Sequence, residues 1–322
     1  MACHYATKTE KTDLIRSAVI GVGYLGKFHA QKYAQLPDSE LVAVCDTNLA
    51  TARELATQLG TQAVNNIDAL LPQVDALSIV VPTQQHYPIA KKCLLAGKHI
   101  LLEKPMTTTV AQAQELVEIA HQQNVVFQIG HLERFNPAIL ALENVLETPM
   151  FIESHRVAPF NPRGADVNVI LDLMIHDIDI ILDIVDADVT HIDAKGVAVL
   201  SKDTDIANAR LKFTNGCVAN VTASRAGMKS ERKMRIFQHN AYISVDFQNK
   251  KLGIHRKGKG EQFPGIANID SQEQVFEQGD ALNAEIASFL RCIKEGGKPK
   301  VSGEAGMRAL AAAIEITQLL HA

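Results

Sequence analysis

The sequence predicts a two-domain protein, with a doubly wound parallel α/β sheet in its first half and an α+β domain with an open, largely antiparallel sheet in its second. The first observation is the segment LIRSAVIGVGYLGKFHA, in which an apolar strand breaks into a glycine turn that opens a helix. The second is an alternation of Val/Ile/Leu-rich strands with amphipathic helices up to about residue 130. The third is a train of alternating strands that follows one apolar helix after Asn136–Pro137.

In the first half, a helix follows nearly every expected strand. The strands cover residues 14–20, 40–45, 75–82, 99–102 and 125–129, and the helices cover 25–36, 49–59, 86–96 and 110–122. Near-continuous apolar strands between helices are typical of a parallel sheet covered on both faces. We therefore expect residues 14–130 to form one domain, preceded by a disordered polar tail at residues 1–13.

The second half begins with a helix over about residues 170–185. Strands are expected at 190–200, 206–213, 217–224, 234–239, 241–246 and 251–256, with a hairpin turn at Asn215–Gly216. The chain ends in an Ala/Leu-rich helix over residues 303–320, which we expect to pack back on the first domain. The pattern predicts an α+β domain at 131–300 and a C-terminal helix within 301–322.

The composition argues against several functional classes. The 322 residues carry 32 Lys and Arg against 36 Asp and Glu, a net charge of −4, and no basic run indicates nucleic-acid binding. The apolar runs are too short to span a membrane, and the N-terminus lacks the apolar core of a signal peptide. Five scattered cysteines without CxxC spacing fit reduced thiols. We expect a cytoplasmic protein without nucleic-acid or membrane partners.

The glycine turn predicts a binding site for NAD. Gly21 permits a tight turn, Gly23 lets the backbone approach a pyrophosphate, and Gly26 lets helix and strand pack closely. The expected cofactor-binding residues of the same turn also include Tyr24 and Leu25. A second strand ends about 20 residues later in Asp46, whose carboxylate can accept both ribose hydroxyls of NAD and repels the 2′-phosphate of NADP.

Lys104 is the first candidate for catalysis. It follows the strand at 99–102 and Glu103, and ligands of doubly wound sheets bind at the carboxyl ends of the strands. A lysine beside an oxidised nicotinamide meets a positive neighbour and loses water, which favours the neutral form that accepts a proton. The alternative is a structural ion pair between Lys104 and Glu103.

The apolar helix at 170–185 supplies a second group of candidates. Asp172, His176, Asp179 and Asp183 are spaced four, three and four residues apart, which places them on one helix face. Because unpaired carboxylates are costly to bury, this stripe should face a wet pocket. Alternatively, the stripe faces bulk solvent, or Asp172 and His176 bind a metal, although no third ligand is spaced nearby. We predict no metal site.

Weaker candidates lie after other strands and near the domain junction. Pro82, Thr83 and His86 follow a central strand and could line the nicotinamide side, although His86 could instead cap the next helix. The candidates for substrate binding near the domain junction are His131, Arg134, Asn136, Arg156 and Arg163. The three arginines suit a phosphorylated substrate, with surface ion pairing as the alternative. The basic run at 229–235 is expected to be a solvated loop.

Together these residues resemble the glucose–fructose oxidoreductase/inositol dehydrogenase family. Its members carry GxGxxG followed by His-Ala, here His29–Ala30, and the triplet EKP, here Glu103–Lys104–Pro105. They also carry a helix reading DxGxHxxD, matched here by Asp172, His176 and Asp179. Met174 stands where glycine is usual in that helix. The resemblance spans essentially the whole chain, and the triplet together with this helix is far more specific than the glycine turn alone.

The resemblance implies a Rossmann domain joined to an α+β domain that binds substrate and forms dimers or tetramers through its open sheet. It implies NAD(P)-linked oxidation of a sugar hydroxyl. It also implies that Lys104 and His176 act as the acid/base pair, with Asp172 orienting the histidine or sharing the proton.

Within this family, GHLERFNPAI and DLMIHDIDI resemble the UDP-N-acetylglucosamine 3-dehydrogenases. Those enzymes supply a 3-keto nucleotide sugar for amination, as in lipid A variants with a 3-amino sugar, and the arginines named above would then face the diphosphate. The rival interpretations are a dehydrogenase of inositol or a free hexose, an NAD-dependent glycosidase that uses the same transient oxidation, and a cofactor-sensing regulatory protein.

Overall fold

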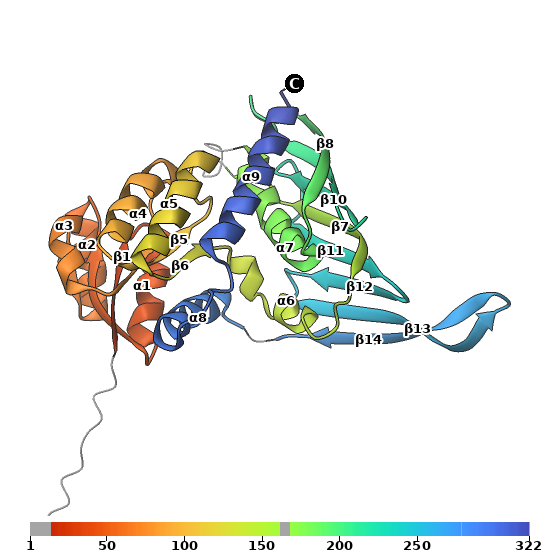
Figure 1. Cartoon of the computed structure of the whole chain (residues 1–322), viewed down its shortest axis with the longest axis horizontal. Coiled ribbons are helices and arrows are strands. Elements are labelled where there is room, and N and C mark those ends of the chain that lie inside the picture. Colours follow the sequence, from red (N-terminus) through yellow and green to blue (C-terminus); the bar gives the residue numbers. More distant parts are fainter. Residues whose placement is uncertain (1–13, 162–167, 278, 322) are drawn as a thin grey trace, which may run out of the picture.

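The computed structural model of the chain describes residues 14–161, 168–277 and 279–321. Two sheets lie side by side, each packed against helices (Figure 1). The tail expected at 1–13 and the candidate Arg163 lie outside the described residues. The four described cysteines are buried free thiols. None of the helices in the described ranges combines the length and apolar character needed to cross a bilayer.

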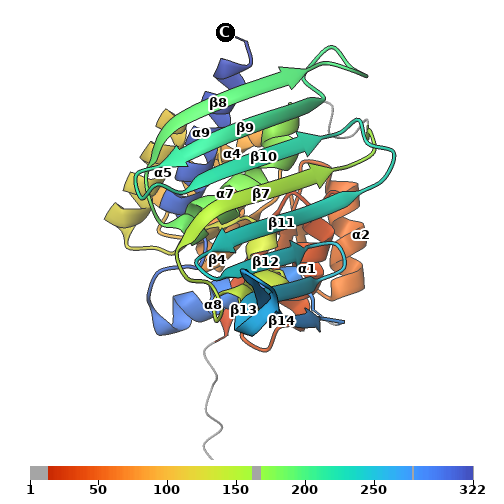
Figure 2. The same ribbon diagram turned by 90° about the vertical axis from the view of Figure 1, so that its right-hand side faces the viewer.

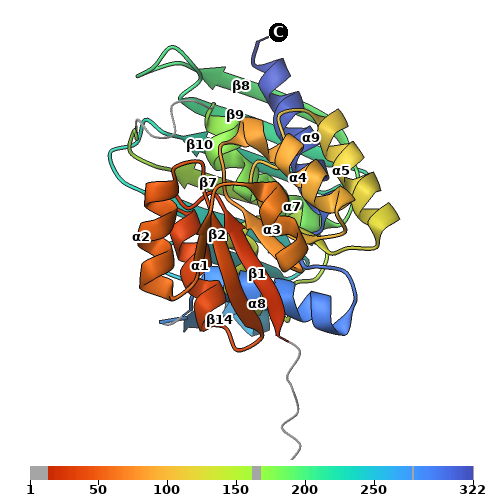
Figure 3. The same cartoon turned by 90° about the vertical axis from the view of Figure 1, so that its left-hand side faces the viewer.

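The first sheet confirms the doubly wound prediction. Its six strands are parallel in the order β3-β2-β1-β4-β5-β6, so the order reverses between β1 and β4, where such sheets bind ligands. The strands are β1 (Ile15–Ile20), β2 (Ser39–Cys45), β3 (Gln62–Val64), β4 (Ala76–Ile79), β5 (His99–Glu103) and β6 (Phe127–Gly130). Its helices, which Figure 3 shows around the sheet, are α1 (Gly26–Gln35), α2 (Leu49–Leu59), α3 (Ile67–Leu70), α4 (His86–Leu95) and α5 (Val110–Gln123).

The second sheet is the expected open, largely antiparallel one. Its order is β14-β13-β12-β11-β7-β10-β9-β8, and only the pair β7–β10 is parallel. The strands are β7 (Pro149–Val157), β8 (Val189–Val197), β9 (Ile206–Phe213), β10 (Val218–Ser224), β11 (Glu231–Gln238), β12 (Ala241–Asp246), β13 (Lys251–Phe263) and β14 (Ile266–Val275). The prediction of a solvated loop at 229–235 is wrong, because most of that run belongs to β11, where Met234 is buried.

The described helices of the second domain cover one face of this sheet and leave the other face open (Figure 2). They are α6 (Pro137–Leu142), α7 (Ile175–Val185), which continues a π-helical segment η5 (Ile170–Met174), and α9 (Gly303–Leu319). In contrast, α8 (Ala281–Glu295) returns to the first domain, where Ile286 and Phe289 join the core beneath β1. Helix α9 contacts α5 and β6 of the first domain as well as α7 and β8 of the second.

Candidate active site

The turn between β1 and α1 is shaped by its three glycines. A Cβ on Gly26 would lie 1.8 Å from Gly21 O, and a Cβ on Gly21 would lie 2.2 Å from Val80 O, so neither position admits a side chain. A Cβ on Gly23 would meet nothing within 4 Å, which leaves that side of the turn open to a phosphate. No side chain caps α1, although Lys27 N and Phe28 N in its first turn already donate to the backbone oxygens of Gly23 and Leu25.

Asp46 is held beside this turn at the end of β2. Its Oδ2 accepts a hydrogen bond from Val22 N at 2.9 Å, and its Oδ1 accepts one from Asn48 N at 2.8 Å. The remaining lone pairs of the fixed carboxylate can accept ribose hydroxyls. Tyr24 and Leu25 are exposed on the same turn. The residues present therefore fit NAD.

A cavity of about 440 Å³ lies between the two domains. The first domain lines it with α1 and the carboxyl ends of β5 and β6, including His29 and Lys104. The second domain contributes Arg156 from β7, Asp172 and His176 from the η5–α7 helix, and Arg232 from β11. The structure thus brings the lysine and the histidine singled out in the sequence to one cavity, although 72 positions (176 − 104) separate them in the chain.

Lys104 spans this cavity to the second domain. Its Nζ donates to the backbone oxygen of Asp172 at 3.1 Å and lies 3.7 Å from the Asp172 Oδ1 atom. Asp172 therefore contacts Lys104, and the structure shows no hydrogen bond between the described side chains of Asp172 and His176. The carboxylate of Glu103 turns instead to His29.

His29 links the glycine-turn helix to the end of β5. Its Nε2 lies 3.1 Å from Glu103 Oε1 and its Nδ1 lies 3.1 Å from Ser78 Oγ, which also bonds Tyr33 OH at 3.0 Å. Burial opposes ionisation of Glu103, but the hydrogen bond from His29 and the neighbouring cations lower its pKa. In the sequence, His29 is recognisable only as part of a family motif, because its partners Ser78 and Glu103 are 49 and 74 residues away.

His176 presents a neutral imidazole to the cavity. Burial, together with the nearby charges of Lys104 and Arg156, lowers the pKa of His176 well below its usual value. Its Nδ1 is buried and has no hydrogen-bond partner among the residues that the structure describes. The buried ring of His131 lies behind it, with 6.4 Å between the ring centroids, and does not line the cavity.

The acidic stripe of the helix is divided between two environments. Asp172 and His176 face the cavity, whereas Asp179 and Asp183 pair with Arg134 at 3.5 and 2.6 Å. The expectation that the whole stripe faces one wet pocket is therefore wrong, because the buried Arg134 guanidinium draws the last two carboxylates to itself. Arg134 does not line the cavity.

Two further candidates, Asn136 and His86, make structural contacts. Asn136 caps α6 by accepting from Ala138 N and donates to Phe247 O. His86 is buried, with both ring nitrogens 2.8 Å from backbone carbonyl oxygens, and so does not act as a helix cap through its side chain. Pro82 and Thr83 follow the end of β4 at the point where the strand order reverses.

Arg156 reaches the cavity with its charge already balanced. Its Nε and Nη2 atoms donate to the two oxygens of Asp177 at 2.8 and 3.1 Å, and its Nη1 donates to Glu133 Oε1 at 3.1 Å. Asp177 and Arg156 are 1% and 3% exposed, so this is a buried ion pair. In the part of the chain that the structure describes, no group of three or more His, Cys, Asp or Glu could hold a metal ion.

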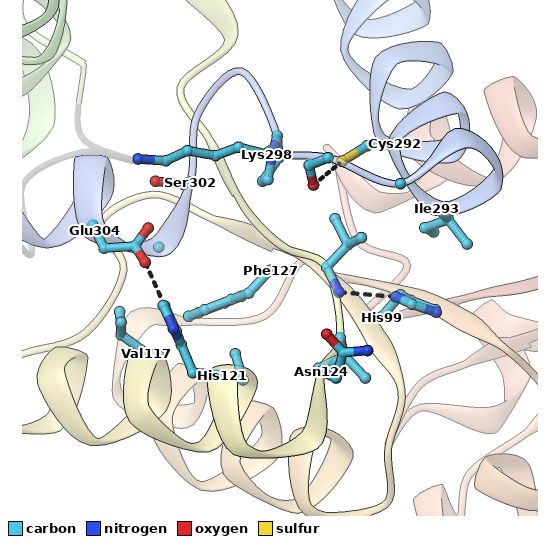
Figure 4. A pocket seen from close by; sticks show the side chains of 17 residues that line it. His99, Val117, His121, Asn124, Phe127, Cys292, Ile293, Lys298, Ser302 and Glu304 are labelled. Atoms are coloured by element: carbon cyan, nitrogen blue, oxygen red, sulfur yellow. Dashed lines mark hydrogen bonds and ion pairs between the residues drawn. The ribbon is translucent and has the colours of Figure 1, made fainter.

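A separate cavity of about 670 Å³ lies at the other end of the first sheet (Figure 4). It is lined by His99 and Phe127, which begin β5 and β6, so it is at the amino ends of these strands rather than at the ligand-binding edge. Its His121 pairs with Glu304 at 2.5 Å. It contains none of the candidate residues named from the sequence.

Comparisons with known proteins agree with this geometry. Residues 15–131 match the domain described as "Oxidoreductase family, NAD-binding Rossmann fold", and residues 151–244 match the GFO/IDH/MocA C-terminal domain. The chain is 42% identical to a UDP-N-acetylglucosamine 3-dehydrogenase from Acidithiobacillus ferrooxidans over 96% of this chain and 98% of that protein. A solved structure of this relative has a TM-score of 0.90 and covers 95% of this chain and 97% of its own.

A more distant relative is a myo-inositol 2-dehydrogenase from Thermotoga maritima, 25% identical over 92% of this chain and 93% of that protein. The resemblance seen in the sequence is thereby confirmed. The chain belongs to the GFO/IDH/MocA family of oxidoreductases and carries its NAD-binding Rossmann domain.

Proposed function

We propose that this oxidoreductase is an NAD-dependent dehydrogenase that oxidises the C3 hydroxyl of UDP-N-acetylglucosamine to the 3-keto sugar. The observation that carries the proposal is the meeting of Lys104 and His176, from different domains, at one cavity beside the β1–α1 turn. The nucleotide sugar is supported by the name of the relative that is 42% identical over nearly the whole chain. Residues 14–130 would then bind the cofactor and residues 131–300 the substrate.

The proposed mechanism divides the work between the two side chains. When bound, NAD supplies the hydride acceptor. The neutral His176 ring takes the proton of the sugar hydroxyl, since cations and burial keep this ring unprotonated. The Lys104 ammonium, held by the Asp172 oxygens, donates a hydrogen bond to the same sugar oxygen and fixes its position. Oxidation therefore requires both groups at once.

The decisive experiment follows nucleotide reduction by the purified protein with UDP-N-acetylglucosamine. We expect NADH to accumulate, with a product lighter than the substrate by two hydrogen atoms, and much slower reduction of NADP, because the fixed Asp46 carboxylate repels a 2′-phosphate. A clear preference for NADP would overturn the argument from Asp46. Release of the sugar without net formation of NADH would indicate a glycosidase. In a separate thermal-shift assay, stabilisation of the protein by free polyols alone would indicate an inositol or hexose dehydrogenase.

The product would be a 3-keto nucleotide sugar, a substrate suited to amination. We infer that the protein works in the cytoplasm, in the supply of 3-amino sugars for lipid A, since both the cofactor and the nucleotide sugar are found there. No nucleic-acid or membrane partner is part of this proposal.

We also infer that the open face of the second sheet joins copies of the chain into a homodimer or homotetramer. Phe151, Phe237, Tyr242 and His255 form a ladder on four adjacent strands of this face, with 5.9, 5.1 and 5.1 Å between successive ring centroids. Their sequence neighbours Ile152, Ile236, Ile243 and Ile254 are buried on the other face. Such a partly exposed aromatic row is typical of an interface.

Light scattering of the purified protein should give the mass of two or four chains. Tyr242→Asp should dissociate it, because a carboxylate in the ladder would lose its water on association. A monomeric wild-type protein, or an unchanged mass in the variant, would contradict the assignment of this face.

A further inference from the structure

Two arginines of the cavity, Arg156 and Arg232, have no part in the proposed mechanism, and Arg232 is the more exposed of them. It is the second residue of β11, where Met234 and Ile236 are buried against the helices. Because side chains of a strand alternate between its two faces, Arg232 lies on the same side as these residues, and it lines the cavity with Lys104 and His176. Its side chain is 45% exposed, so it is open to a ligand from solvent.

Arg232 stands directly opposite Arg156 in the pairing of β7 with β11. Like charges in directly opposed positions destabilise a sheet. A residue with only a structural role would not need a positive charge at this position. Glu133 lies between the two guanidinium groups, with its Oε1 atom 3.1 Å from Arg156 Nη1 and 3.4 Å from Arg232 Nη1.

The arginines of the cavity region differ in how far their donors are engaged. Arg134 is buried against Asp179 and Asp183, and Arg156 is buried in its paired contact with Asp177. Arg232 has five N–H donors, of which the described contacts engage one through the 3.4 Å contact to Glu133. It is therefore the arginine best able to accept an anion without breaking a buried ion pair.

We propose that Arg232 binds the diphosphate of the nucleotide-sugar substrate and selects phosphorylated sugars over free ones; this rests on the proposed function. The guanidinium offers paired N–H donors that match phosphate oxygens. With the sugar at Lys104 and His176, the diphosphate extends toward β11 along the wall of the same cavity. A free polyol leaves this cation unmatched.

The test compares Arg232→Ala with Lys233→Ala, a change at the next residue, which lies on the opposite face of β11 and pairs with Glu231. Arg232→Ala should raise the KM for UDP-N-acetylglucosamine and the inhibition constant of UDP by about ten- to a hundredfold, the range for charge-assisted hydrogen bonds. The value of kcat should stay nearly constant, since the sugar still meets Lys104 and His176. Arg232→Lys should recover part of the affinity because it keeps the charge, and Lys233→Ala should resemble the wild type.

The result separates this inference from the proposed function. An active wild-type protein whose KM and UDP inhibition are the same in Arg232→Ala would overturn the role of Arg232 and leave the substrate assignment standing. A wild-type protein that does not oxidise UDP-N-acetylglucosamine would overturn the proposed function itself. If Arg232→Ala does not fold, UDP titration of Arg232→Gln by calorimetry decides the point, because an unchanged affinity in that variant also overturns the proposal.

Discussion

Replacing Lys104 by alanine should lower kcat by about 10²–10³-fold, the usual cost of removing a positioned hydrogen-bond donor at a reacting oxygen. The variant loses the donor that reaches from β5 to the Asp172 oxygens, so the sugar hydroxyl is no longer fixed beside His176. His176→Ala should have a loss of similar size, because the other imidazole that lines this cavity, that of His29, has both ring nitrogens engaged by Ser78 and Glu103. The affinity for NAD should change little in either variant, since the glycine turn and Asp46 are untouched.

Steady-state kinetics with a separate NAD titration would measure both quantities. His121→Ala is a matched control, because His121 is an exposed histidine in the cavity at the amino ends of the strands (Figure 4). It should leave kcat unchanged. Near-normal turnover in both Lys104→Ala and His176→Ala would remove the basis for the proposed mechanism.

Asp177→Ala should lower the free energy of unfolding by about 3–5 kcal/mol, the cost of leaving one member of a buried ion pair without its partner. Arg156 is 3% exposed and would keep its ion pair with Glu133 and the contact of its guanidinium with the Phe247 ring. Removing Asp177 therefore leaves an almost fully buried guanidinium charge that cannot lose its proton and lacks two of its three hydrogen bonds to carboxylates.

Urea unfolding of the variant and of Asp193→Ala would check this value. Asp193 is 59% exposed and lies 3.7 Å from Lys212, so its loss should cost no more than about 1 kcal/mol. Equal losses in the two variants would show that the Arg156–Asp177 pair does not have the expected role in stability.

Five of the six strands of the first sheet were predictable because they are rich in buried apolar residues, whereas the edge strand β3 was missed because it has only three residues and is partly exposed. The helix expected at 49–59 is α2 with the same bounds. In the second domain the inner strand β7 and the edge strand β14 were missed, since β7 carries Glu153, His155 and Arg156 among its apolar residues and β14 is largely exposed. Helix α8 was missed although Leu282, Ile286, Phe289 and Leu290 have helical spacing. That signal was present in the sequence.

The candidate site was predictable only where a local motif contains the chemistry. Lys104 follows a strand end, and His176 belongs to a spaced polar stripe, so both could be named without a structure. Arg134 was named for its charge alone, and the sequence does not show that it forms ion pairs with Asp179 and Asp183. Arg232 belongs to the run that was predicted to be a solvated loop. Its proposed role depends on its position opposite Arg156 on the neighbouring strand, and these two residues are 76 positions (232 − 156) apart in the chain.

Helix α9 places its side chains in two cores at once. Leu310 packs in the core of the first sheet, while Ala313 and Ile316 pack in the core of the second. A hinge motion that separated the two domains widely would remove the apolar neighbours from one side of α9. We therefore expect cofactor and sugar to exchange without a wide separation of the two domains.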